Sequence, residues 1–356
     1  MARIVEPKIE ETNTESDEDN WTIGAEPFKP IDMTQVANKK GKIAAPTSQA
    51  IKRAADILRG GDPIGLPTET VYGLAADACS DDAVAKVFAL KQRPQFNPLI
   101  IHVASIEMAQ TLVHMCPLAR LVAEHFWPGP LTMVLPRLPD CPVSLLASAG
   151  LDTLAIRIPA HPVARALLDE VATPIAAPSA NLSGNISPTK AQHVADQLDI
   201  NIILDGGPCK VGLESTILKV DDNQLILLRP GGIAVAHIEQ AIGHAVDPLT
   251  NPDKITAPGQ MIAHYAPSKP IRLDALDVAA NEGLLAFGKP LPGAKMVANL
   301  SVGANTTEAA ANLFAMMHEL DASDCAAIAV MPIPDEGLGQ AINDRLQRAA
   351  APRDKS

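Results

Sequence analysis

The sequence has few aromatic residues: tryptophan, tyrosine and phenylalanine together make up 3% of its 356 residues. The hydrophobic cores must therefore be built from aliphatic side chains, and little material is left for the aromatic platforms on which nucleic-acid bases stack. Positive charge is also in deficit, because the formal net charge is −12. This balance argues against a dominant surface for nucleic acid or an anionic membrane, although a local basic cavity remains compatible with it.

Cysteines are few as well, with five scattered along the chain and no C-x-x-C pair among them. A zinc site and a disulfide framework are both disfavoured, and a reducing cytosol fits this usage. The N-terminus has no basic-then-apolar signal pattern, and no apolar run reaches the roughly 18 residues that a membrane span needs. These absences predict a soluble, cytoplasmic protein without a membrane segment.

The length of 356 residues favours two domains over one core. Residues 1–40 are rich in aspartate and glutamate, which predicts a disordered acidic tail. Residues 41–245 carry strand and helix patterns in alternation and predict an α/β domain built on a twisted open sheet with helices. Residues 246–270 lack periodicity and predict a linker. Residues 271–350 predict a smaller, Rossmann-like parallel α/β domain. Neither domain carries a G-x-x-x-x-G-K-S phosphate loop or a G-x-G-x-x-G motif.

The stretch GLPTETVYGLAADA, from Gly65 to Ala78, places polar groups at a corner between apolar segments. Pro67 cannot donate to a sheet ladder, so the chain is expected to leave the sheet there. In an open α/β sheet, ligands bind beyond the carboxyl ends of the strands. An ordinary junction between a strand and a helix has the same composition, so this stretch alone leaves both interpretations open.

A second polar loop, PSANLSGNISPT, covers residues 178–189. Serine, asparagine and glycine at this density provide many small hydrogen-bond donors, but a linker would have the same composition. The loop lies between a predicted buried strand, 175–177, and a predicted helix, 190–198. Because both ends are held in this way, a ligand-binding loop is favoured over a linker.

Polar residues gather near several predicted strand ends, namely Thr70, Lys91, Arg93, Asn97, His102, Thr153, Arg157, Ser179, Asn181, Ser187, Ser215 and Arg229. Four of them are cations, and if these converge they form an electropositive pocket suited to a polyanion such as a nucleoside triphosphate. Any single arginine is better explained by a helix cap or a surface ion pair, and a lone histidine such as His102 is more often a core residue than a catalyst.

Seven segments carry a resemblance to a known family: GLPTETVYGLAADA, KQRPQFNPLIIHV, FWPGPLTMVL, GLDTLAIRIPAHP, APSANLSGNISPT, DGGPCKVGLESTI and LRPGG. In order and spacing they resemble the YrdC domain of threonylcarbamoyl-AMP synthases. The pairs Lys91-x-Arg93 and Ser179-x-Asn181 match that family's signature. Residues 41–245 thus resemble a YrdC-like catalytic domain. The HYAP segment within 246–270 and the trailing domain resemble the two-domain branch of the family.

The resemblance implies an enzyme, a nucleotidyltransferase that converts L-threonine, bicarbonate and ATP to L-threonylcarbamoyl-adenylate and diphosphate. The product would supply the threonylcarbamoyladenosine modification of tRNA through a downstream transfer machinery, and direct tRNA binding by this chain has no support. Mg²⁺ is expected to accompany ATP. The carbamate is labile in water, so the linker is a candidate lid, a hypothesis prompted by the specific pair His264 and Tyr265.

Roles follow from the matching positions of the family. The resemblance implies that threonine is bound by Thr70, His102, Arg157, Ala177 through its backbone, and Ser215. It implies that ATP is bound by Arg93, Asn97, Thr153, Ser179, Ser187, Arg229 and Tyr265. Catalysis at the phosphate end is assigned to Lys91, Arg93, Ser179 and Asn181, with no protein ligand for a metal ion.

Two other functions remain to be weighed. An RNA-binding or regulatory YrdC-like module would lack synthase activity, and the acidic charge and scarce aromatics count against it. A related enzyme using carbamoyl phosphate, as in hydrogenase maturation, would be expected to carry acylphosphatase-like and zinc-finger segments. The cysteine pattern offers no such finger.

Overall fold

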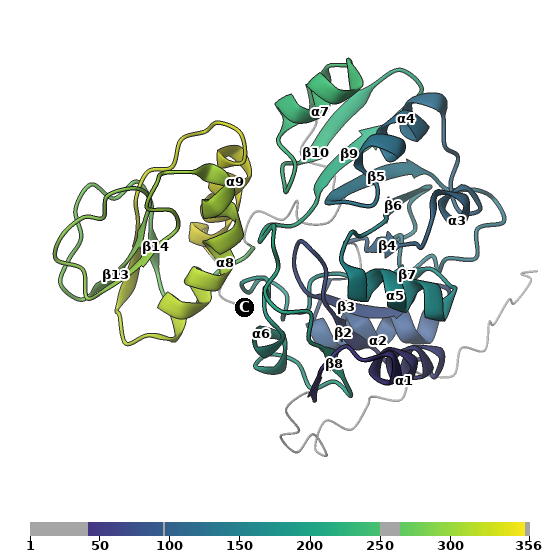
Figure 1. The fold of residues 1–356 in the computed structure, drawn as a ribbon, viewed down its shortest axis with the longest axis horizontal. Coiled ribbons are helices and arrows are strands. Elements are labelled where there is room, and N and C mark those ends of the chain that lie inside the picture. Colours follow the sequence, from purple (N-terminus) through teal and green to yellow (C-terminus); the bar gives the residue numbers. More distant parts are fainter. Residues whose placement is uncertain (1–41, 95–96, 250–263, 353–356) are drawn as a thin grey trace, which may run out of the picture. The chain divides into compact units, whose positions relative to one another are not determined.

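The computed structural model describes residues 42–94, 97–249 and 264–352. These residues form one sheet of eleven strands and a second sheet of four, each accompanied by helices (Figure 1). The predicted fold class, an α/β domain with a large sheet followed by a smaller one, is confirmed. The predicted acidic tail and most of the predicted linker lie outside the described residues.

The larger sheet has the strand order β1-β8-β2-β3-β7-β4-β6-β5-β9-β10-β11. Its strands are β1 (Ile43–Ala44), β2 (Ile64–Leu66), β3 (Gly73–Asp77), β4 (Ile100–His102), β5 (Leu131–Pro136), β6 (Thr153–Arg157), β7 (Ile175–Ala176), β8 (Ile203–Leu204), β9 (Thr216–Val220), β10 (Leu225–Arg229) and β11 (Val246–Pro248). The sheet contains both parallel pairs, such as β4 with β6, and antiparallel pairs, such as β5 with β6. The sheet is therefore mixed, and its order departs widely from sequence order.

Seven helices accompany this sheet among the described residues: α1 (Ser48–Arg59), α2 (Asp81–Lys91), α3 (Ile106–Gln110), α4 (Pro117–Phe126), α5 (Pro162–Val171), α6 (Ala191–Ala195) and α7 (Val235–Ile242). Side-chain caps set where the first two begin. The Thr47 hydroxyl accepts a hydrogen bond from the backbone N–H of Ala50, and the Ser80 hydroxyl accepts one from Ala83. Each cap supplies a hydrogen-bond acceptor for a backbone N–H of the first helical turn, which has no acceptor within the helix.

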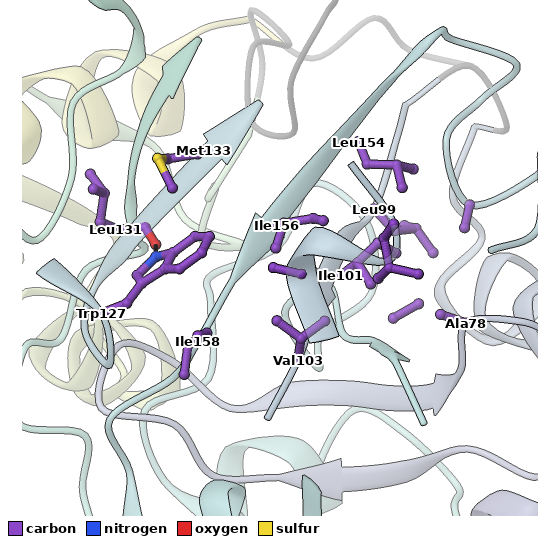
Figure 2. Close-up of a cluster of buried hydrophobic side chains, with 14 of the residues drawn as sticks. Ala78, Leu99, Ile101, Val103, Trp127, Leu131, Met133, Leu154, Ile156 and Ile158 are labelled. Atoms are coloured by element: carbon purple, nitrogen blue, oxygen red, sulfur yellow. Dashed lines mark hydrogen bonds between the residues drawn. The ribbon is translucent and has the colours of Figure 1, made fainter. Parts of the chain in front are cut away.

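Side-chain alternation along the central strands creates two faces. One face builds the main core, in which Ile101, Met133 and Ile156 pack together, as Figure 2 shows. Trp127 closes this cluster, and its indole Nε1 donates to the backbone oxygen of Leu131 at 2.7 Å. Because successive strand residues point to opposite faces, the residues between these apolar ones are directed to the other face. The functional residues of the central strands lie there.

The smaller sheet is entirely parallel, with the order β12-β15-β13-β14. Its strands are β12 (Ile271–Arg272), β13 (Glu282–Ala286), β14 (Met296–Asn299) and β15 (Ala327–Val330), and its helices are α8 (Thr306–Ala322) and α9 (Gly339–Ala350). The two helices lie together beside β13 and β14 (Figure 1). Apolar residues of α8 and α9 form one core with those of the sheet. The predicted parallel α/β unit is confirmed.

The structure differs from the sequence expectations at short elements. Val246–Pro248, which the prediction places in the linker, forms β11 and pairs in parallel with β10. Three residues carry no usable alternation, and the edge of a sheet tolerates the proline. The helix predicted over 190–198 is reduced to α6, Ala191–Ala195. In the described part of the chain, no helix combines the length and the apolar character that crossing a membrane requires.

Candidate functional site

One cavity gathers most of the predicted site residues. Nine of the fourteen line it, namely Thr70, Arg93, His102, Arg157, Ala177, Ser179, Ser215, Arg229 and Tyr265. They come from strand ends and loops that are far apart in the sequence. Three arginines therefore share one small space in a protein of net charge −12. The convergence that the sequence analysis left open is present in the fold.

The sheet faces explain how two of these residues reach the cavity. His102 on β4 and Arg157 on β6 are register partners in adjacent parallel strands. Their strand neighbours Ile101 and Ile156 point into the core, so His102 and Arg157 point the opposite way. The structure thus places the Arg157 side chain in the cavity and not in solvent.

Arg157 organises the corner at Pro67–Gly73. Its Nη2 donates to Oε1 of Glu69 at 2.6 Å, and its Nη1 donates to the hydroxyl oxygen of Thr70 at 2.9 Å. Thr70 also exchanges a 2.8 Å hydrogen bond with the hydroxyl of Thr68. Burial alone would raise the pKa of the Glu69 carboxyl, but the adjacent Arg157 holds it below its usual value. The corner therefore contains a buried, charged pair that directs the Thr70 hydroxyl.

His102 is uncharged in this setting. Burial, reinforced by the positive charge of Arg157, lowers its pKa to about 3. Its Nδ1 has no hydrogen-bond partner among the described residues. A buried ring nitrogen without a hydrogen-bond partner is energetically costly, and this one belongs to a residue that lines the cavity.

Lys91 lies behind the cavity wall. Its Nζ donates to the backbone oxygens of Ser179 and Asn181, both at 2.5 Å, and the side chain is 1% exposed. The amide nitrogen of Asn181 in turn donates to the backbone oxygens of Leu182 and Asn185. The two signature pairs thus meet, and here Lys91 and Asn181 shape the polar loop that presents Ser179. Burial keeps the pKa of Lys91 well below its ordinary value.

The opposite wall is formed by β9 and β10. The Ser215 hydroxyl lies 2.7 Å from that of Thr132, and Nη2 of Arg229 donates to the backbone oxygen of Ser215 at 2.8 Å. The turn after Arg229 runs tightly against this strand. A Cβ atom added at Gly231 would lie 2.4 Å from the backbone of Ser215, so only glycine fits there.

A carboxylate completes this wall. Glu214 lines the cavity, and its Oε1 accepts a hydrogen bond from the Ser187 hydroxyl at 2.5 Å. Burial alone would raise the pKa of the Glu214 carboxyl, but the nearby Arg345 and Arg229 lower it below its usual value. Ser187 itself lies just outside the cavity lining and contacts it through Glu214.

The HYAP segment contributes His264 and Tyr265 to the lining. Tyr265 is 1% exposed, and its ring stacks on Phe314 of α8 with the centroids 5.5 Å apart. Its backbone φ is 63°, a left-handed conformation that is uncommon for a bulky residue. Such strain persists only where surrounding contacts enforce it, so the backbone conformation of Tyr265 is fixed by its neighbours.

Two predicted residues sit farther from the cavity. The backbone oxygen of Asn97 accepts a 3.3 Å hydrogen bond from Nε of Arg93, so Asn97 borders the site through that arginine. Thr153 opens β6, four residues before Arg157, and lines a separate cavity together with Lys219. It lies on the same strand face as Arg157, because the two are an even number of residues apart.

Sequence reasoning missed three residues that shape the site: Glu69, Glu214 and Arg345. The first two occur inside segments already singled out by their motifs. Arg345 had one signal, since it falls on the buried stripe of α9 beside Ile342 and Leu346. A charge within an apolar stripe requires a buried partner.

Metal-ligating groups do not cluster in the described residues, where no three His, Cys, Asp or Glu side chains are placed to hold an ion. The two carboxylates nearest the cavity are each paired with an arginine, Glu69 with Arg157 and Glu214 with Arg345.

Two family models match the chain. One, described as "Telomere recombination", matches residues 56–231. The other, described as "Threonylcarbamoyl-AMP synthase, C-terminal domain", matches residues 233–351. Their order corresponds to the larger and the smaller sheet.

Similar proteins cover nearly the whole chain. The threonylcarbamoyl-AMP synthase of Bacillus subtilis is 41% identical over 324 residues, which is 85% of this chain and 93% of that protein. The threonylcarbamoyl-AMP synthase of Pyrococcus abyssi is 37% identical over 341 residues, which is 90% of this chain and 99% of that protein. A crystal structure of P. abyssi Sua5 complexed with L-threonine superimposes with a TM-score of 0.79 at 36% identity, covering 87% of this chain and 96% of that one.

Proposed function

Because the chain belongs to the threonylcarbamoyl-AMP synthase family, we propose that the cavity described above is where L-threonine, bicarbonate and ATP become L-threonylcarbamoyl-adenylate and diphosphate. The observation that carries this proposal is the meeting of Arg93, Arg157 and Arg229 with small hydroxyl groups around one space. Arginines suit a polyanionic substrate, and buried hydroxyls suit a small polar amino acid.

The threonine end is the part of the cavity formed by Thr70, His102, Arg157 and Ser215. The Thr70 hydroxyl and the neutral imidazole of His102 both offer acceptors, and the arginine nearby favours a carboxylate. A site that pairs a substrate hydroxyl through buried partners rejects analogues lacking it, because those partners would be left unpaired.

The ATP end would involve Arg93, Ser179, Arg229 and Tyr265. Arg93 is held by two backbone oxygens, those of Asn97 and Pro98, so its position is preorganised. Burial lowers the pKa of Arg93 to about 10, which still leaves it protonated at neutral pH. Preorganised cations act on developing phosphate charge without reorganisation at the moment of reaction.

The chemistry needs no protein nucleophile. The amine of threonine and bicarbonate form a carbamate with loss of water, and a carbamate oxygen then attacks the α-phosphorus of ATP. The bond from that phosphorus to the diphosphate oxygen breaks, and diphosphate leaves with the electron pair. Catalysis then rests on positioning the two substrates and on cations that stabilise the phosphate oxygens.

Mg²⁺ would enter on the phosphate oxygens of ATP, since the carboxylates at the site are occupied by arginines. It would neutralise charge on the leaving diphosphate. Chelation with EDTA should therefore abolish diphosphate release, and added Mg²⁺ should restore it. Release that persists in EDTA would contradict this role.

The adenylate product is labile, so we propose that a downstream tRNA threonylcarbamoyl-transfer machinery receives it in the cytoplasm, where ATP and tRNA are available. The decisive experiment is to measure diphosphate release from ATP with threonine and bicarbonate omitted in turn. Release should require both. Release that ignores threonine would refute the proposal, and salt-dependent RNA binding without ATP turnover would favour a non-catalytic module instead.

A further inference from the structure

Arg345, on helix α9 of the smaller domain, reaches the wall of the cavity. The side chain is fully buried, and its Nε donates to Oε2 of Glu214 at 2.8 Å. Its Nη2 donates to the backbone oxygen of Pro230 at 2.9 Å, and its guanidinium lies 5.1 Å from the centroid of the Tyr265 ring. One side chain of the smaller domain thus contacts three separate segments of the site.

Each of these three contacts leads to a residue assigned to ATP, although Glu214 is also the neighbour of Ser215, which is assigned to threonine. Glu214 holds the Ser187 hydroxyl through its other oxygen, Pro230 follows Arg229, and Tyr265 is itself on the lining. Burying an arginine is unfavourable unless it is paired and hydrogen-bonded. Nη1 of Arg345 also donates to the carboxylate of Asp344, the preceding residue of α9, but the partners of Nε and Nη2 belong to the larger domain beside the cavity.

We propose that Arg345 is a positioning residue for ATP: it neutralises Glu214 and holds the Ser187 hydroxyl, the Arg229–Gly231 turn and the Tyr265 ring in one arrangement. The smaller domain then contributes directly to the reaction by completing the ATP wall. This inference rests on the proposed function, because it concerns the same cavity.

Charge gives the reason. Glu214 lines the cavity proposed to bind the triphosphate of ATP, and a carboxylate there without a paired cation would repel the phosphates. The cation nearest to Glu214 on the larger domain is Arg229, which now donates to Ser215. Without Arg345, Glu214 would compete for Arg229 and draw it away from Ser215. At the threonine end, only Ser215 contacts Arg229, whereas Thr70 and Arg157 are held by the separate pair with Glu69, so threonine binding should weaken less than ATP binding.

The test is steady-state diphosphate release by the full-length chain carrying Arg345→Gln. We expect KM for ATP to rise at least about tenfold, with KM for threonine changed by less than about threefold. Arg345→Lys should recover part of the ATP affinity, since it restores charge but not the planar fork that contacts Glu214 and Pro230. The double variant Arg345→Gln with Glu214→Gln should also recover part of it, because the uncompensated charge is gone.

Arg272→Gln is the matched control. This arginine also pairs with two carboxylates, Asp277 and Glu282, but it is half exposed and both carboxylates lie within the smaller domain. Its loss should leave both KM values unchanged. If Arg345→Gln proves too unstable to assay, Arg345→Lys and the double variant carry the same comparison.

The outcomes separate cleanly. Two results would overturn the positioning role and leave Arg345 as a contact between domains. One is an equal rise in KM for ATP and KM for threonine. The other is a fall in turnover that parallels a fall in thermal stability while both KM values stay unchanged. If the unmodified chain itself releases no diphosphate with threonine and bicarbonate, the proposed function fails. If it does so and Arg345→Gln behaves like Arg272→Gln, only the present inference fails.

Discussion

Arg157 and Glu69 form an ion pair at the edge of the cavity, with 2.6 Å between Nη2 of the arginine and Oε1 of the glutamate. Their side chains are only 4% and 10% exposed. The same guanidinium donates to the Thr70 hydroxyl and, through Nε, to the backbone oxygen of Gly129. A single buried pair therefore joins the corner after β2, the end of β6 and the turn before β5.

Glu69→Gln should destabilise the protein at neutral pH by about 3 kcal/mol, because it leaves the Arg157 charge buried without its partner. The pKa of Glu69 is depressed in the folded protein. Its stabilising effect is therefore complete above the unfolded-state pKa and is lost as the pH falls through the folded-state value. Urea unfolding between pH 7 and pH 3 should show the gap between parent and variant closing below about pH 4.5. A gap independent of pH would show that the pair is not ionised.

Thr70→Ala should weaken the use of threonine more than that of ATP, because it removes the hydroxyl that accepts from Arg157 and faces the cavity. We expect KM for threonine to rise by about tenfold, as for a lost buried hydrogen bond, with KM for ATP nearly unchanged. Thr70→Ser retains the hydroxyl and serves as the control. An equal rise in KM for threonine and KM for ATP would show that this corner has only a structural role.

Lys91→Met tests the support of the polar loop. The substitution keeps the volume but leaves the backbone oxygens of Ser179 and Asn181 without their donor, at a cost of about 2 kcal/mol or more. Turnover should fall with either substrate limiting, since the whole loop shifts. Lys86→Met, on the same helix, removes an exposed pair with Asp62 and should cost less than about 1 kcal/mol. Similar effects of the two substitutions, measured by thermal unfolding and diphosphate release, would contradict this role.

Tyr265→Ala removes the ring that contacts both Phe314 and the Arg345 guanidinium. Truncating a buried aromatic side chain should cost about 3 kcal/mol, and both ATP affinity and turnover should decline because the ring is part of the cavity wall. Tyr265→Phe keeps the ring and should preserve these contacts. If isothermal titration with ATP and the turnover rate were both unaffected by Tyr265→Ala, the assignment of Tyr265 to ATP would be withdrawn.

Local chemistry in the sequence accounts for much of the fold. Hydroxyls of Thr47 and Ser80 cap the helices that follow them, and alternation along β6 directs Arg157 and Ile156 to opposite faces. These features depend on neighbours within a few residues, which is why periodicity and capping suffice to predict them. The same reasoning fails for β11, because three residues at a sheet edge carry too little pattern.

The residue types of the site could also be predicted from the sequence, since cations and small hydroxyl residues occur beside strand ends in an acidic chain. Their arrangement could not, because it depends on a strand order that places β4 between β7 and β6 and joins segments more than a hundred residues apart. Lys91 could be identified as important from its motif, yet only packing turns its charge toward the backbone of the polar loop. Arg345 shows the limit most clearly, since its partner Glu214 lies 131 positions away and no local pattern can report a contact made by the folding of one domain against another.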